Sequence, residues 1–404
     1  MKLPRAVKRQ DLYYVAVLLV ATMLIWCAAY NRWTAEAWRT PTTYGGDAWW
    51  GMAVAKAIAT GEVLPVLPKQ PESLGAPFVA NWNDYPSVEE GLNAWWGLLA
   101  RSFRILVGSN IALLAAHLFA ALTFYLVCRR LRYERSFSAA GALLFAFSPY
   151  ALWRGLPHLG LTYCWHLPLG ILVVWWCLAK APLMRSRRKL GLSIAVAVVF
   201  GMQNPYYTGI LLQFLFLASL CQLVRRASWR QVLAPIVVVG SFAVVTFLLM
   251  NVDTFFWRST GAASGGAVAR SYQHLEVYAL KPIELIVPKQ HRLETLARWT
   301  EEHYFTKAAL LGEAGAAYLG VVALGAFAWL VWVAFERLAK RTAAPVPSHL
   351  LFIVWVCAYS VVGGINGIVG FALELFRGTN RYSIVILLLL LLFLVRELSR
   401  LARR

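Results

Sequence analysis

Acidic side chains are scarce in this chain of 404 residues, and those in polar stretches are the first candidates for chemistry. The sequence contains four aspartates: Asp11, Asp47, Asp84 and Asp253. Asp47 follows two glycines in YGGDAWW, where the tryptophans favour a helix at a membrane surface that begins at the carboxylate. A carboxylate in that place can accept a proton from a hydroxyl group, although capping of its own helix explains the position equally well.

A second polar stretch, NWNDYPSVEEG, contains Asp84, Glu89 and Glu90. Asp84 is the candidate for a direct role here. A turn at the Tyr-Pro pair that follows it accounts for much of the polarity without any chemistry. Both interpretations stay open from the residues alone.

Cationic side chains stand in two short connections between apolar segments. SPYALWRGLPHLGLTYCWH contains Arg154 and His158, and LFRGTNRYS contains Arg377 and Arg381. An arginine at such a connection can bind two phosphate oxygens at once, and a histidine can share a proton or a hydrogen bond. The alternative is that these side chains only reach lipid headgroups.

A third connection, QNPYYTG, contains Tyr206 and Tyr207. These rings either contact a substrate or belong to the belt of aromatic residues at a membrane interface. Several other catalytic patterns are absent from the sequence: an Asp-x-Asp pair, a phosphate-binding Gly-x-x-x-x-Gly-Lys loop and a His-Glu-x-x-His zinc motif. Their absence argues against nucleotide hydrolysis and zinc proteolysis.

The composition shows which kind of structure must position these residues. Hydrophobic residues make up 60% of the chain and charged residues 14%, against roughly 25% charged residues in a soluble domain. Apolar stretches long enough to cross a bilayer as helices recur along the whole sequence. We predict one all-α, polytopic transmembrane domain over 1–404, with about ten crossings at 12–30, 109–127, 137–153, 160–179, 190–205, 208–224, 231–250, 317–335, 350–373 and 382–395.

Basic residues alternate along the chain in a way that predicts orientation. Of the 39 lysines and arginines, 23 lie in six segments: 1–11, 128–136, 180–189, 225–230, 336–349 and 396–404. Positively charged loops stay in the cytoplasm, so both termini are predicted to be cytoplasmic. The net charge of +20 then reflects topology and contact with anionic lipid, and it does not argue for nucleic acid.

Two long segments, 31–108 and 251–316, fall on the opposite, outer side. We expect amphipathic helices in both, including an interfacial helix at 91–108 that Arg101 and Arg104 keep out of the bilayer. Inside the predicted crossings His117 is the main ionisable residue, whereas ion-coupled transporters usually carry charges near the middle of the membrane. The chemistry is therefore expected at the outer face.

In this arrangement the chain resembles the GT-C superfamily of polytopic glycosyltransferases, and more closely a bacterial group of GT-C-like proteins. The features that carry the resemblance are an aspartate soon after the first crossing, two long outer segments and a set of short motifs. The matching motifs are LGAPFVANWNDYP, SPYALWRGLPHLGL, NPYYTG, LKPIELIVPKQHR, GEAGAAYLG and FRGTNRYS. The resemblance adds His291 and Glu313 to the candidate site residues.

The resemblance implies a hexosyl- or pentosyltransferase of the bacterial inner membrane. Such an enzyme moves a sugar from a polyprenyl-phosphate carrier to a lipid, glycan or protein acceptor. Asp47 and Asp84 would be the catalytic carboxylates, and they would also be the ligands of a divalent cation, Mg²⁺ or Mn²⁺, if one is used. The cations would hold the departing phosphate. Relatives of this kind usually continue with an outer C-terminal domain, which is expected to be absent here.

Two other functions stay open. A lipid or polysaccharide transporter would share the crossings and the outer cations, but it would need a polar path through the helices. A non-catalytic scaffold for envelope assembly would need no carboxylate at the surface. The sequence leaves the oligomeric state undefined.

Overall fold

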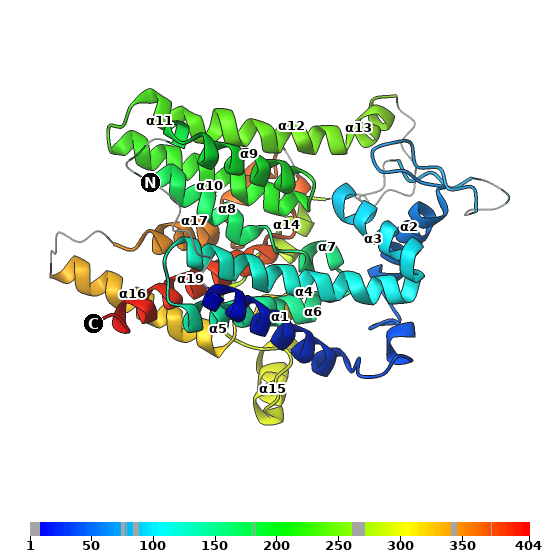
Figure 1. The fold of residues 1–404 in the computed structure, drawn as a ribbon, viewed down its shortest axis with the longest axis horizontal. Helices are drawn as coiled ribbons and strands as arrows, with labels where there is room; N and C mark the ends of the chain where they lie inside the picture. Colours follow the sequence, from blue (N-terminus) through cyan, green and yellow to red (C-terminus); the bar gives the residue numbers. More distant parts are fainter. Residues whose placement is uncertain are drawn as a thin grey trace. The chain divides into compact units, whose positions relative to one another are not determined.

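The computed structural model describes residues 9–73, 77, 79–83, 89–179, 181, 183–260, 271–340, 346–372 and 374–404. Within these ranges the regular elements are α-helices and short 3₁₀ or π turns, with no strand (Figure 1). The all-α class predicted from the apolar stretches is confirmed.

Six helical segments are long and apolar enough to cross a membrane, which identifies a multi-pass membrane protein. They are α1 (Arg9–Tyr30), α4 (Ile105–Arg130), α5 with α6 (Arg135–Arg154), α10 (Pro205–Val224), α11 with α12 (Trp229–Met250) and α16 (Val321–Ala339). Two further apolar helices are shorter: α8 (Leu167–Leu178) and α17 (Ser348–Ser360). The remaining two predicted crossings fall on α9 (Arg187–Gly201) and α19 (Ser383–Leu401).

The chain divides into two compact units. Unit 1 contains Met1–Thr22, Ala120–Arg154 and Arg270–Arg404, and unit 2 contains Met23–Phe119 and Gly155–Ala269. The predicted segment 31–108 therefore lies in unit 2. The predicted segment 251–316 is divided between unit 2, up to Ala269, and unit 1, from Arg270. Each unit is described by itself below.

In unit 1, α19 is the central helix, against which α5, α16 and α17 pack. Its run from Ser383 to Phe393 is buried on all sides, as a helix that is apolar all round must be. The short helices α14 (Gln273–Val277), α15 (Glu294–Thr300) and α18 (Ile365–Val369) belong to the same unit. Of these, α15 protrudes from its neighbours (Figure 1).

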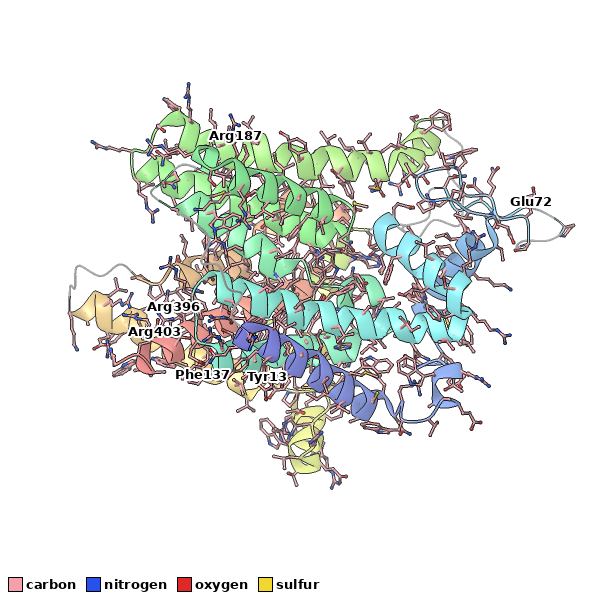
Figure 2. The ribbon with its side chains drawn as sticks, in the orientation of Figure 1. Tyr13, Glu72, Phe137, Arg187, Arg396 and Arg403 are labelled. Atoms are coloured by element: carbon pink, nitrogen blue, oxygen red, sulfur yellow. The ribbon has the colours of Figure 1, made fainter. Side chains whose placement is uncertain are left out.

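In unit 2, the helices α8, α9, α10 and α12 lie side by side (Figure 1). At one end of them lies a tightly packed pair, α2 (Asp47–Thr60) and α3 (Glu90–Phe103). Glycine makes this contact possible, because a Cβ atom at Gly97 would lie 2.4 Å from Ile58 Cγ2. Figure 2 labels Arg187, where α9 begins, and Glu72, after α2, at opposite ends of the unit.

The helix expected at 91–108 is present but ends earlier. Arg104 has a positive φ of 66°, which ends α3 at Phe103 and lets α4 begin at Ile105. Residues 105–108 thus belong to the next helix. The remaining short helices of unit 2 are α7 (Leu159–Thr162) and α13 (Val252–Ser259).

Candidate functional site

Three of the predicted site residues meet in unit 1 as an ion cluster. The Nη2 atom of Arg154 donates to Oε2 of Glu313 at 2.6 Å. Arg381 donates to the same carboxylate from Nη2 to Oε1 at 2.8 Å and from Nε to Oε2 at 3.2 Å. Two guanidinium groups therefore hold the carboxylate of Glu313, and Arg381 contacts both of the carboxylate oxygens.

Local packing explains how three distant segments reach this point. Arg154 is the last residue of α6 (Pro149–Arg154), and Glu313 precedes the 3₁₀ turn Ala314–Ala316. Gly315 lies against the indole of Trp153, since a Cβ atom there would be 2.6 Å from its Nε1 atom. Arg381 lies in the 3₁₀ turn Thr379–Tyr382, whose Thr379 hydroxyl donates to the Ser360 carbonyl.

The electrostatics of the cluster keep its carboxylate ionised. Burial by itself would raise the pKa of Glu313, but the charges of Arg381 and Arg154 and their hydrogen bonds outweigh it and hold the pKa well below its usual range. Glu313 is consequently a poor proton acceptor. Its role in this geometry is to orient the two arginines.

Arg154 lies behind the carboxylate and has no exposed surface. Its guanidinium group lies against the rings of Tyr150 and Trp153, at 5.4 and 5.7 Å, and its Nε and Nη1 atoms have no hydrogen-bond partner among the described residues. The sequence assigned Arg154 to phosphate contact. In this structure it supports Glu313, and Arg381 is the partly exposed cation.

Arg377 supplies a further cation in unit 1. Its guanidinium group lies 5.5 Å from the ring centre of Tyr278, and its Nη1 atom is 3.4 Å from Nδ1 of His274. The backbone N–H of Asn380 donates to the Tyr278 carbonyl, which ties this segment to the turn that carries Arg381. Tyr278 was not a predicted site residue, and it lies two residues before the LKPIELIVPKQHR motif.

In unit 2 the structure brings Asp47 and His158 together. The Oδ2 atom of Asp47 lies 3.6 Å from Nδ1 of His158, and the side chain of Asp47 is 71% exposed. The residue that caps α2 is Gly46, with a φ of 64°, and Asp47 is the first residue of the helix. The alternative that Asp47 is the helix cap is therefore wrong, because only glycine readily adopts the conformation at the cap.

The other predicted residues lie elsewhere. His291 lies in the connection before α15, where its Nδ1 atom accepts from the N–H of Leu293 at 3.1 Å. Tyr206 and Tyr207 are buried in the first turn of α10, and the Tyr207 hydroxyl donates to the Leu161 carbonyl at 2.6 Å. This position fits packing better than substrate contact. Asp84 lies outside the described residues.

Metal binding finds no additional support. In the part of the chain that the structure describes, no group of three or more His, Cys, Asp or Glu side chains has the arrangement of a metal site. The Mg²⁺ or Mn²⁺ alternative depends on Asp84 and stays a prediction. A buried cluster of Lys69, Glu90 and Asp253 in unit 2 was not expected, because its members are far apart in sequence and only Glu90 lies in a stretch with candidate residues.

The comparison with known families gives one match. Residues 97–404 match a family described as a domain of unknown function, DUF6311. No curated protein and no solved structure matches the chain. The matched range contains the ion cluster of unit 1 and His158, whereas Asp47 precedes it.

Proposed function

The chain belongs to the DUF6311 family, and we propose that it is a glycosyltransferase acting at the outer face of the bacterial inner membrane. The donor is a sugar on a polyprenyl-phosphate carrier, and the acceptor is a glycan, lipid or protein. The observation that carries this proposal is the cluster in which Glu313 orients Arg381 in front of the buried Arg154.

The cluster has the charge and the rigidity that a phosphate group requires. Two arginines share one carboxylate, and Arg377 lies in the same loop as Arg381. Guanidinium groups held in place in advance stabilise a developing phosphate charge without reorganising during the reaction. Cations on the outer side also run against the general bias of membrane proteins toward positive charge inside.

The proposed reaction divides the work among these residues. A bond forms between the acceptor oxygen and the anomeric carbon of the sugar, and the bond from that carbon to the phosphate oxygen breaks. Asp47 takes the acceptor proton, while the phosphate leaves with the electron pair. Arg381 and Arg377 hold the leaving phosphate, Arg154 positions Glu313, and His158 orients Asp47.

We further propose ten membrane crossings with both termini in the cytoplasm. Each of the ten predicted crossings overlaps a helix, and six of these helical segments are long and apolar enough to span. Arg187 and Glu72 lie at opposite ends of unit 2 (Figure 2), as a cytoplasmic and an outer residue should. Met184→Cys and Ser73→Cys test this: an impermeant maleimide should label only Ser73→Cys from outside, and labelling of Met184→Cys on intact cells contradicts the orientation.

Binding of polyprenyl phosphate to the purified protein in lipid nanodiscs tests the phosphate site. Arg381→Ala should weaken binding about tenfold or more, because a hydrogen-bonded charge is lost. Arg381→Lys should recover only part of the affinity, since lysine lacks the planar fork. The matched control is Arg298→Ala on α15, an exposed arginine outside the cluster. Unchanged affinity in both Arg381→Ala and Arg377→Ala contradicts the proposal.

The same preparation distinguishes the rival functions. Incubated with a lipid-linked sugar and membrane fractions as acceptor, a transferase releases polyprenyl phosphate and glycosylated product. A transporter instead moves the intact lipid-linked sugar across a liposome membrane without product. A scaffold does neither. Either transport without product or no reaction at all contradicts the transferase proposal.

A further inference from the structure

A second ion cluster, in unit 2, is almost completely buried. The Nζ atom of Lys69 lies 3.2 Å from Oε1 of Glu90 and forms a short contact with Oδ2 of Asp253. All three side chains are at least nine-tenths buried. Glu90 begins α3 and Asp253 lies in the first turn of α13, so one lysine joins the ends of two helices that are far apart in the chain.

The charges in this cluster do not balance. Among the described residues, one cation faces two carboxylates, and the Asp253 Oδ1 atom has no hydrogen-bond partner. Burial raises the pKa of Glu90, although the charge of Lys69 opposes the shift. Because burying charged groups is costly, such a cluster contributes little net stability, and its best-supported use is to fix one arrangement of the elements it joins.

Lys69 also fixes the backbone around it. Its N–H donates to Oδ1 of Asn83 at 2.6 Å, and its carbonyl accepts from the N–H of Trp82 at 2.9 Å. Val66 has a φ of 71°, which is strained for a β-branched residue, and its N–H donates to Oε2 of Glu90 at 3.3 Å. Strain of this kind persists only where the surroundings hold it.

The same contacts lead to Asp47. The ring of Trp82 lies edge-on to the ring of Trp50, with the ring centres 4.6 Å apart. Trp50 is three residues after Asp47 on α2, and α2 packs tightly on α3, which begins at Glu90. Lys69 is thus linked to the helix of Asp47 by two routes, through Trp82 and through α3.

We propose that Lys69 is a positioning residue that fixes α2, and with it Asp47, by joining the first turns of α3 and α13. Lys69 does not touch a substrate in this role, because it is enclosed. The catalytic part of the inference rests on the proposed function. The structural part, that Lys69 holds α2 and the segment around Trp82, does not.

Hydrogen exchange on the full-length protein in nanodiscs tests the structural part. Lys69→Met should speed exchange of the amides of Val66, Lys69 and Trp82 and of the second turn of α2 by about tenfold or more, since their local opening becomes easier. The control Lys56→Met removes an exposed lysine from α2 and should change nothing. Exchange in Lys69→Met equal to that in Lys56→Met overturns the proposal.

If Lys69→Met does not accumulate in membranes, the exchanged pair Lys69→Glu with Glu90→Lys decides. This double variant keeps one cation between two carboxylates. Recovery of accumulation and of slow exchange supports the proposal, and failure to recover either overturns it.

Activity provides the readout that a merely structural residue would not change. A displacement of about 1 Å at a reacting group can cost roughly 10²-fold in rate. Lys69→Met should therefore lower kcat for sugar transfer with KM for the lipid donor unchanged, and Lys69→Arg should restore part of it. If product formation falls only as much as protein abundance, so that kcat is unchanged, the residue is structural only. If Asp47→Asn is fully active, Asp47 is not the base of the proposed reaction, while the exchange result still stands.

Discussion

The two ion clusters have opposite compositions. In unit 1, Arg154 and Arg381 share the carboxylate of Glu313, and Arg381 is partly exposed. In unit 2, Glu90 and Asp253 share the ammonium group of Lys69, and all three are enclosed. Both clusters join segments that are distant in sequence, so this property does not distinguish one cluster from the other.

The difference lies in the sign of the unbalanced charge and in access to it. In unit 1 the partly exposed member is a cation, Arg381. In unit 2 the described members are one cation and two carboxylates, and all three side chains are at least nine-tenths buried. A buried ion cluster thus indicates a binding site only where one of its members reaches the surface.

The largest expected effect concerns a carboxylate outside both clusters. Glu313 is held ionised and Glu90 is enclosed, whereas Asp47 is exposed and is the proton acceptor of the proposed reaction. Asp47→Asn should lower product formation by roughly 10²–10⁴-fold, the loss expected for a positioned base. Product per unit of protein in isolated membranes measures it.

Abundance separates the catalytic role of Asp47 from a structural one. Because Gly46 caps the helix, Asp47→Ala should also accumulate normally, at a cost of about 0.3–1 kcal/mol from the charge at the helix start. Asn and Ala variants at normal abundance and full activity remove Asp47 from the mechanism.

Glu313→Gln tests the unit 1 side of the comparison. The change leaves the buried Arg154 without its anion, so the free energy of unfolding should fall by about 3–5 kcal/mol. Glu336→Gln, at an exposed pair with Lys340, is the control and should change the unfolding midpoint little, because water screens an exposed ion pair. Thermal unfolding in detergent compares the two variants. Equal midpoints would mean that Arg154 does not depend on Glu313.

The sequence predicted the helices well because apolar stretches of membrane length have few alternatives. It also selected Arg154, Glu313 and Arg381 separately, through short motifs. It did not predict that the three form one cluster, because pairs 159 and 68 residues apart are joined only by the folded chain.

Two further features, the cap of α2 and the pairing of Lys69 with Asp253, could not be predicted from the sequence. Asp47 was open to interpretation as a cap because the backbone of Gly46 decides the question, and sequence does not specify a φ of 64° there. The pairing of Lys69 with Asp253 spans 184 residues, and neither residue stands in a motif. Buried charges of this kind are visible only in three dimensions.

Glu284 extends the comparison to a single buried carboxyl group in unit 1. Its Oε1 atom accepts from the Tyr304 hydroxyl at 3.1 Å and lies 4.0 Å from Nζ of Lys281, while burial raises its pKa to about 7. A raised pKa means that the neutral form is favoured in the folded state. The stability it contributes is complete below the ordinary value of 4.5 and is lost as the pH rises toward 7.

Glu284→Gln keeps the neutral form at every pH. Relative to the wild type, this variant should therefore gain stability between about pH 5 and pH 8. Unfolding midpoints across that range measure the gain. Glu276→Gln, at an exposed neighbour in the same segment, should show no such trend. A flat difference between Glu284→Gln and the wild type contradicts the burial of an ionisable carboxyl group here.

The smallest effect is expected for Glu90→Gln, which compares the cluster of unit 2 directly with that of unit 1. This change brings the cluster of Lys69 and Asp253 to neutrality, and the glutamine oxygen can still accept from the N–H of Val66. The free energy of unfolding should change by about 1 kcal/mol or less, the net worth of one hydrogen bond.

Since burial raises the pKa of Glu90, the wild type loses stability as the pH rises through that pKa, so any gain in the variant should appear at the alkaline end. Glu313 has a lowered pKa, so the stability it contributes is present above its ordinary pKa of 4.5 and is lost progressively as the pH falls below that value. Measured side by side, Glu90→Gln should unfold close to the wild type and Glu313→Gln far below it. A loss in Glu90→Gln as large as that in Glu313→Gln would mean that Glu90 is needed in its ionised form, and the charge excess of the enclosed cluster would then have to be balanced by a group other than a proton.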